Sequence, residues 1–200
     1  MKIFRALLLP WCYQAEPRQR DIVMRNEPNI AKIRESVLFL LNSASGDLDQ
    51  YKIAKAIFLA DVSHLNQYGR PVTYDNYVAM RFGPVPSKTY ELLSKSPKTL
   101  EVEVKAQQQR RNFFGPLRKH EKLELSESDE FELESALKTV EPMSFNELMH
   151  LTHDHIAWKT AWEAKKDDAP KMEYAQLFKK RDQDRADYIA RFSNKVGCTT

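Results

Sequence analysis

The stretch Tyr68–Leu93, YGRPVTYDNYVAMRFGPVPSKTYELL, interrupts the helical patterns on both sides of it. Its centre, FGPVPS, places Gly83 close to Pro84 and Pro86 in a chain that has only 5 glycines. Glycine adopts backbone angles that a side chain blocks, and proline fixes φ and removes an amide donor. The tyrosines and the phenylalanine around this turn offer large areas for packing. The stretch therefore predicts a rigid packing corner, on which any exposed ring would form a binding surface.

Helical patterns precede this corner. Residues 28–46, PNIAKIRESVLFLLNSASG, place apolar side chains on one face of a helix. Asp47, followed three residues later by Gln50, predicts a capping box for the next helix. Gly69 stands where a left-handed residue ends a helix, and the proline that follows blocks continuation.

Two alternating segments after the corner predict strands. Ser87 is expected to cap a helix that ends near Lys95. LEVEVKA (100–106) and HEKLEL (120–125) alternate apolar and charged residues, which favours a β-hairpin with a long tip between them. From Lys105 to Lys122 there are six Lys or Arg and one acidic residue. Such a basic hairpin could serve as a nucleic-acid wing, although a basic patch alone is a weak signature.

The rest of the chain is again helical in pattern. A helix is expected to begin near Ser126 or Ser128, a second after the capping residue Ser144, and a third after Asp154. A final charged helix is expected to cover about 172–192. The fold class predicted is mainly α, a single helical-bundle domain with a small β-hairpin and hence a minor α+β character.

The chain divides into three expected parts. Residues 1–27 are expected to be a peripheral extension, with Met24 as an alternative start. Residues 28–165 form the domain, and 166–200 a charged helix and tail. The short apolar run near the start is too short to span a bilayer, and a weak signal or a surface anchor is the lesser alternative for it. No membrane partner is expected. A net charge of +3 does not by itself indicate a nucleic-acid partner.

One face of the helix before the corner carries Asp61, His64 and Tyr68 at i, i+3 and i+7. A carboxylate beside a histidine is a pattern of acid–base and metal sites. Polar pairs at this spacing are also ordinary on helices, and we expect Asp61 and His64 to pair at the polar edge of a packed helix.

No metal, cofactor or nucleophile is expected. The segment MHLTHDH holds three histidines, but an expected helix break separates the last from the others, so capping and packing roles are favoured over zinc. No phosphate loop, dinucleotide fingerprint or nucleophile elbow is present in the sequence. The cysteines Cys12 and Cys198 have neither metal-ligand nor disulfide spacing, which favours the cytoplasm.

The segment 55–93, KAIFLADVSHLNQYGRPVTYDNYVAMRFGPVPSKTYELL, resembles the Panacea domain of SocA-like antitoxins. A second block, ELMHLTHDHIAWKTAW (147–162), looks like the C-terminal element of that family. The resemblance spans about residues 30–165. The residues that carry it are Tyr68-Gly69-Arg70-Pro71, Ala79-Met80, Phe82-Gly83-Pro84-Val85, Leu151, Thr152, His153 and Trp158.

The resemblance implies a non-enzymatic antitoxin of a bacterial or phage two-gene module. It would neutralise a toxin encoded nearby by direct contact, or act as an adaptor that presents the toxin to a protease. The alternatives are a DNA-binding regulator and a hydrolase or metal enzyme that uses Asp61, His64 and His153. The candidate partner-binding or motif residues are Asp61, His64, Tyr68, Phe82, Gly83, Pro84, His153 and Trp158.

Overall fold

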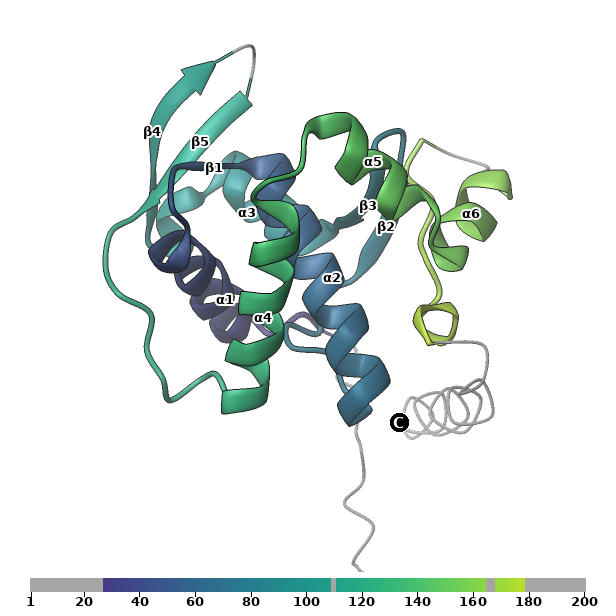
Figure 1. Cartoon of the computed structure of the whole chain (residues 1–200), viewed down its shortest axis with the longest axis horizontal. Coiled ribbons are helices and arrows are strands. Elements are labelled where there is room, and N and C mark those ends of the chain that lie inside the picture. The colour runs from purple at the N-terminus through teal and green to yellow at the C-terminus, as the bar shows by residue number, and fades with distance from the viewer. Residues whose placement is uncertain (1–26, 109–110, 165–167, 179–200) are drawn as a thin grey trace, which may run out of the picture.

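The computed structural model describes residues 27–108, 111–164 and 168–178 (Figure 1). The described chain is mainly α with two small antiparallel sheets, as the sequence predicted. Its α-helices are α1 (Ile30–Ser43), α2 (Gln50–Tyr68), α3 (Ser87–Lys95), α4 (Glu127–Val140), α5 (Phe145–His153) and α6 (Ile156–Glu163). Two short 3-10 helices are η1 (Pro97–Leu100) and η2 (Tyr174–Leu177).

The strands form two separate sheets. One has the order β1-β5-β4, and the other is the hairpin β2–β3. Both are antiparallel. The strands are β1 (Leu48–Asp49), β2 (Tyr77–Met80), β3 (Gly83–Pro86), β4 (Val102–Gln108) and β5 (Arg111–Pro116). The β4–β5 hairpin extends from one end of the body, away from α6 (Figure 1).

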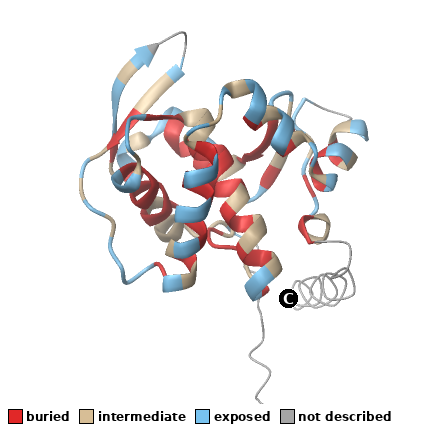
Figure 2. Ribbon diagram, viewed as in Figure 1, coloured by how far each residue is buried: buried red, intermediate tan, exposed pale blue. Residues whose placement is uncertain are grey.

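Helix α2 is the centre of the fold, and buried residues run along it (Figure 2). One of its faces joins the main core with α1 and α4, where Ile53 and Ile57 are fully buried. Another face joins a second core with β2, α6 and residues 172–178, where Phe58 and Leu65 are buried. The helix thus ties the bundle to the predicted corner. Burial of a large apolar side chain stabilises a fold by about 1.5–3 kcal/mol.

Most predicted helix starts are confirmed, but some predicted caps are wrong. Gly69 ends α2 with a left-handed φ of 77°, as expected. The capping residue of α2 is Asp49, which accepts from the amide of Lys52, and the predicted Asp47 lies before it. Asp49 is placed for this role because it lies on β1, whose pairing with β5 fixes where the chain turns into the helix.

Helix α3 is capped from outside its own segment. Ser87 makes no capping bond. Instead the carboxylate of Asp75 accepts from the amides of Lys88 at 2.9 Å and Thr89 at 2.8 Å. The capping box predicted at Ser144 is present, and α4 begins after Ser126, one of its two predicted starts, with a capping box of its own. Helix α6 is capped by His155, whose ring nitrogen accepts from the amide of Ala157, rather than by the predicted Asp154.

The second strand of the larger hairpin differs from the prediction. Residues 120–125, HEKLEL, are not a strand. The partner of β4 is β5, formed by RNFFGP, and the two strands pair as far as Gln108 and Arg111. Phe114 on β5 is fully buried, and this burial outweighs the simple alternation of 120–125. The α-helix predicted for about 172–192 is wrong in its described part, where the chain forms only the 3-10 helix Tyr174–Leu177 and Phe178 is extended. Residues from 179 onward lie outside the described residues, as do 1–26 and both cysteines.

Candidate functional site: the glycine–proline corner

The predicted corner is a hairpin whose turn is formed by Arg81 and Phe82. In its register Met80 pairs with Gly83 and Ala79 with Pro84. Gly83 has a φ of +104°, a conformation that L side chains rarely adopt. The free edge of β2 is covered by a later segment, because the amide of Ala79 donates to the carbonyl of Pro170 at 2.8 Å. Strand β2 is therefore held on both of its edges by backbone bonds, with β3 on one side and the later segment on the other.

Asp61 holds the loop that leads from α2 to the corner. Its carboxylate is 1% exposed and accepts four hydrogen bonds from three residues. The amides of Val72 and Thr73 donate at 2.9 Å each, the Thr73 hydroxyl at 2.5 Å and the Tyr77 hydroxyl at 2.7 Å. Burial raises the pKa of Asp61 to about 6, although the bonds from Thr73 and Tyr77 oppose this rise. The arrangement fixes a loop and leaves no oxygen facing solvent.

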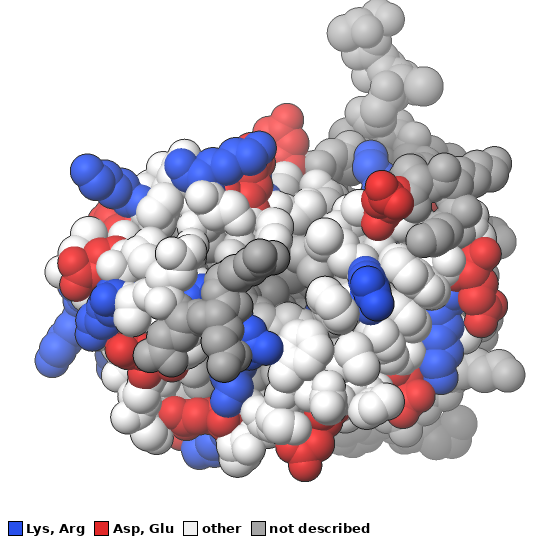
Figure 3. Space-filling model, turned by 90° about the horizontal axis from the view of Figure 1, so that it is seen from above, with Lys and Arg blue, Asp and Glu red and all other residues white. Residues whose placement is uncertain are grey.

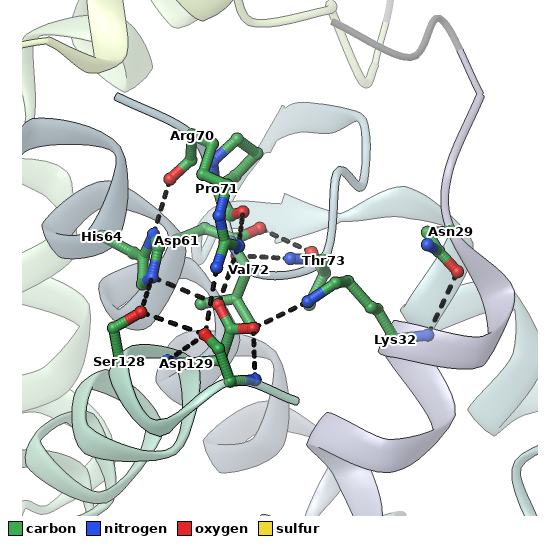
Figure 4. A network of polar contacts seen from close by, with 11 residues as sticks. Asn29, Lys32, Asp61, His64, Arg70, Pro71, Val72, Thr73, Ser128 and Asp129 are labelled. Carbon is green, nitrogen blue, oxygen red and sulfur yellow. Dashed lines mark hydrogen bonds and ion pairs between the residues drawn. The ribbon is translucent and has the colours of Figure 1, made fainter. Parts of the chain in front are cut away.

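His64 holds the same loop from its other side (Figure 4). Its Nδ1 lies 2.7 Å from the carbonyl oxygen of Arg70, and because a carbonyl only accepts, Nδ1 carries a proton. Its Nε2 lies 3.0 Å from the Ser128 hydroxyl and 3.1 Å from Asp129. Burial lowers the pKa of His64. Asp61 and His64 thus bond to different groups, and the predicted pairing of the two is wrong.

Asp129 connects this loop to two other helices. Its carboxylate accepts from Lys32 on α1 at 2.7 Å and from Arg70 at 2.8 Å (Figure 4). Burial opposes its ionisation, but these bonds outweigh burial and the pKa of Asp129 is lowered. The third residue of the predicted helix face, Tyr68, lies at the end of α2 with its ring 4.4 Å from that of His64 and remains half exposed.

A buried lysine that the sequence analysis missed lies inside the corner. Lys55 on α2 is 0% exposed, and its Nζ donates to the carbonyl of Pro84 at 2.7 Å. The same Nζ lies 5.0 Å from the centre of the Tyr51 ring. Burial lowers the pKa of Lys55 to about 7. The only sequence signal was its position between the apolar residues of α2, where a charged side chain is out of pattern.

Replacement of Lys55 by methionine is expected to remove a dependence of stability on pH. Because the folded pKa is about 7 and the ordinary value is 10.5, the unfolded chain binds more protons between these two values. The free energy of unfolding of the wild type should therefore rise by about 2 to 3 kcal/mol between pH 6 and pH 9 from this group. The free energy of unfolding of Lys55→Met should lack that rise. Its advantage over the wild type should therefore be largest at pH 6.

Urea unfolding at pH 6, 7.5 and 9 measures this effect. Lys52→Met is the matched control, because Lys52 is a half-buried lysine on the same helix whose Nζ bonds to the carbonyl of Glu141. Parallel curves of the free energy of unfolding against pH for the wild type and Lys55→Met would show that burial does not lower the pKa of Lys55.

The second motif block packs directly on the corner. The ring of His153 stacks on Trp158 at 3.8 Å, and Trp158 stacks on Trp162 at 5.5 Å. The indole nitrogen of Trp158 donates to the carbonyl of Met80 at 3.0 Å. His153 ends α5 and α6 begins at Ile156, so the predicted helix break after His153 is present. Thr152 and His153 also approach Gly83 closely.

The eight residues singled out from sequence thus fall into two groups. Gly83, Pro84 and His153 lie around Lys55, with Trp158 stacked on His153. Asp61 and His64 lie on the loop side of α2, and Tyr68 lies at its end. Phe82 stands apart at the turn and is 47% exposed. In the described part of the chain no three His, Cys, Asp or Glu side chains gather as metal ligands would. The residues missed, which have no motif of their own, are Lys55, Asp75 and Asp129.

The fold and the corner together define a mainly α domain. The glycine–proline corner has a packing role in this domain, and its turn exposes the ring of Phe82. The family model described as "Antitoxin SocA-like, Panacea domain" matches residues 53–159. This match covers more than half of the chain, and the chain belongs to that family. It confirms the resemblance stated from the motifs. Comparison with curated proteins and with solved structures gave no match.

None of the helices in the described part of the chain combines the length and the apolar character of a membrane-spanning segment.

Proposed function

We propose that this protein is the antitoxin of a two-gene module and neutralises its cognate toxin by direct protein–protein contact. The observation that carries the proposal is membership of the antitoxin family across residues 53–159. The domain of 28–165 is the part that would bind. Neutralisation by occupancy means that the antitoxin blocks the toxin simply by staying bound to it. This needs a stable scaffold and an exposed surface, and the corner offers both.

The polar groups of the corner support a binding role over catalysis. A general base must reach a substrate proton within about 2.6–3.2 Å. Asp61 is enclosed by Val72, Thr73 and Tyr77, and His64 is 0% exposed. His153 is stacked against Trp158 on the other side of the corner, so the three residues of the enzyme alternative do not converge.

The DNA-binding alternative rests on the β4–β5 hairpin, and its charge is partly neutralised. Lys105 lies 3.6 Å from Asp47, and Arg111 lies 3.3 Å from Asp49. Arg118 bonds to Glu35 at 2.6 Å and also to Glu101. Fewer free cations mean fewer counterions released on binding DNA. The hairpin therefore gives this alternative less support than its sequence suggested.

Growth rescue tests the proposed function. Expression of the neighbouring gene alone should arrest growth, and co-expression of this chain should restore it. The two products should co-purify as a stable complex through size exclusion. A toxin that is not bound by the wild-type chain, or whose effect on growth is unchanged by it, would contradict the proposal.

The same cells separate occupancy from delivery to a protease. Occupancy predicts that the amount of toxin, followed by immunoblot after translation is stopped, stays constant or rises when this chain is present. An adaptor predicts that the toxin disappears faster and that deletion of the protease abolishes rescue. Either result keeps the antitoxin assignment and decides its mechanism.

A further inference from the structure

Three aromatic rings from separate elements meet at the exposed turn of the corner. Phe82 of the β2–β3 turn lies 5.4 Å from Phe145, the first residue of α5, with the rings edge to face. Phe145 in turn lies 4.6 Å from Tyr51 near the start of α2. Two arginines complete this group, which we call the aromatic platform: Tyr51, Arg81, Phe82, Arg111 and Phe145.

The platform is fixed by its own contacts. The Tyr51 hydroxyl donates to the carbonyl of Phe82 at 3.3 Å, which ties the turn to α2. Burial, followed by the nearby charge of Asp49, raises the pKa of Tyr51 to about 12, so this hydroxyl stays protonated and able to donate. Rings held in this way lose little conformational entropy when a partner binds.

Two guanidinium groups lie over the faces of these rings. That of Arg111 lies 5.0 Å from the centre of the Phe145 ring, and that of Arg81 lies 5.5 Å from that of Phe82. Arg111 is close to Asp49, whereas Arg81 is exposed and has no carboxylate within ion-pair distance among the described residues. In the view from above, the part of the surface that is not covered by grey atoms is uncharged near its middle, with Lys and Arg groups and Asp and Glu groups around it (Figure 3).

We propose that the aromatic platform is the toxin-contact surface, and that it binds an acidic segment of the toxin. In this arrangement carboxylates of the partner pair with Arg81 and Arg111, and an apolar side chain of the partner packs against Phe82. The inference rests on the proposed function, the neutralisation of a toxin by direct contact. It adds which surface of this chain makes the contact and which kind of toxin segment binds there. Aromatic residues and arginine are the residues enriched at the energetic centres of protein interfaces.

Charge favours an acidic protein segment over nucleic acid. The platform holds two cations, one of which already faces Asp49. Nucleic-acid affinity depends on neutralising many phosphates, whereas one or two carboxylates suffice in a protein interface. An arginine whose guanidinium already lies over an aromatic ring can pair with a carboxylate of the partner. The same ring can then contact an apolar side chain of that partner.

Two substitutions in the full chain test the platform. Phe82→Ala removes the most exposed of the three rings of the platform. Arg81→Glu reverses the charge of the platform arginine that has no carboxylate beside it. With the product of the neighbouring gene as the probe, we expect each to raise Kd at least 10-fold and to impair growth rescue. The wild-type Kd should also rise with salt, and this rise should be smaller for Arg81→Glu. Melting temperatures should stay within a few degrees of the wild type, because both side chains are exposed.

Matched controls lie elsewhere on the molecule. Phe131→Ala removes a ring that is 61% exposed from the N-terminal half of α4, and Lys122→Glu makes the same charge reversal on the exposed loop before it. The start of α4 and that loop lie at the opposite end of the molecule from α5 (Figure 1). Both controls should bind the toxin as the wild type does.

The outcomes separate this inference from the proposed function. If the wild type neutralises the toxin and both platform variants bind like the controls, the platform is not the contact surface while the antitoxin role stands. If the wild type neither binds nor neutralises the toxin, both fail. A third measurement uses a labelled single-stranded oligonucleotide: loss of its binding in the platform variants, with toxin binding intact, would overturn the acidic-segment proposal in favour of nucleic acid.

Discussion

Gly83→Val is expected to destabilise the whole domain rather than one contact. At a φ of +104° a β-branched residue is strained, which costs about 1–3 kcal/mol. A Cβ at this position would lie 2.7 Å from Nζ of Lys55 and 2.8 Å from the Thr152 hydroxyl, so overpacking adds about 1–3 kcal/mol. A domain of this size should lose about 10 °C or more in melting temperature.

Gly46→Val is the matched control for this prediction. Gly46 has no positive φ, and a Cβ there meets nothing within 4 Å. The same substitution should therefore shift the melting temperature by only a degree or two. An unchanged midpoint for Gly83→Val together with lost toxin binding would make Gly83 a contact residue, and the packing role described for the corner would be wrong.

The corner was predictable because its signals are local. The need for a glycine at a tight turn and for prolines that stiffen it can be stated from the residues alone, and the positive φ of Gly83 confirms the first. The left-handed Gly69, the capping box at Ser144 and the start of α4 near Ser126 were predictable for the same reason. In each case the groups that interact lie within a few positions of one another.

The contacts that hold the corner were not predictable, because their partners are far apart in sequence. Asp75 caps α3 across 13 residues, and Asp129 reaches Lys32 across 97. A sequence pattern shows that an aspartate can cap a helix but does not show which helix comes to it. For the same reason Asp61 and His64 were paired wrongly: their spacing is right, but the loop Arg70–Thr73 supplies different partners to each.

The error in the larger hairpin has a related cause. Alternation over 120–125 is compatible with a strand, but a strand also needs a neighbour in register. The neighbour of β4 is β5 because this pairing buries Phe114. Phe114 pairs with Val104 of β4 on one side and with Leu48 of β1 on the other. Once β5 lies between β1 and β4, residues 120–125 serve as the connection to α4.

Asp61→Ala is expected to destabilise the domain by about 3–5 kcal/mol. The carboxylate is the acceptor for two buried amides and two buried hydroxyls, and alanine would leave all four without it. Each unsatisfied buried donor costs about 1–3 kcal/mol, although the hydroxyls can turn to other acceptors. The loop Arg70–Thr73 would loosen, and with it the hairpin that presents Phe82. Urea unfolding monitored by tryptophan fluorescence measures the loss.

Two further substitutions test this prediction: Tyr77→Phe removes one of the bonds to Asp61, and Asp47→Ala is the control at an exposed aspartate. Tyr77→Phe removes one of the four donors, so in a double-mutant cycle it should be costly in the wild type and nearly neutral in Asp61→Ala. Asp47 is half exposed and lies 3.6 Å from Lys105, so its replacement by alanine should cost less than about 1 kcal/mol. Additive effects of Asp61→Ala and Tyr77→Phe would mean that the carboxylate does not hold the tyrosine in solution. In that case the rigidity of the corner, on which both the exposed turn and the proposed contact surface depend, would have to come from its other contacts, which include the bond from Lys55 to the carbonyl of Pro84 and the stacking of His153 on Trp158.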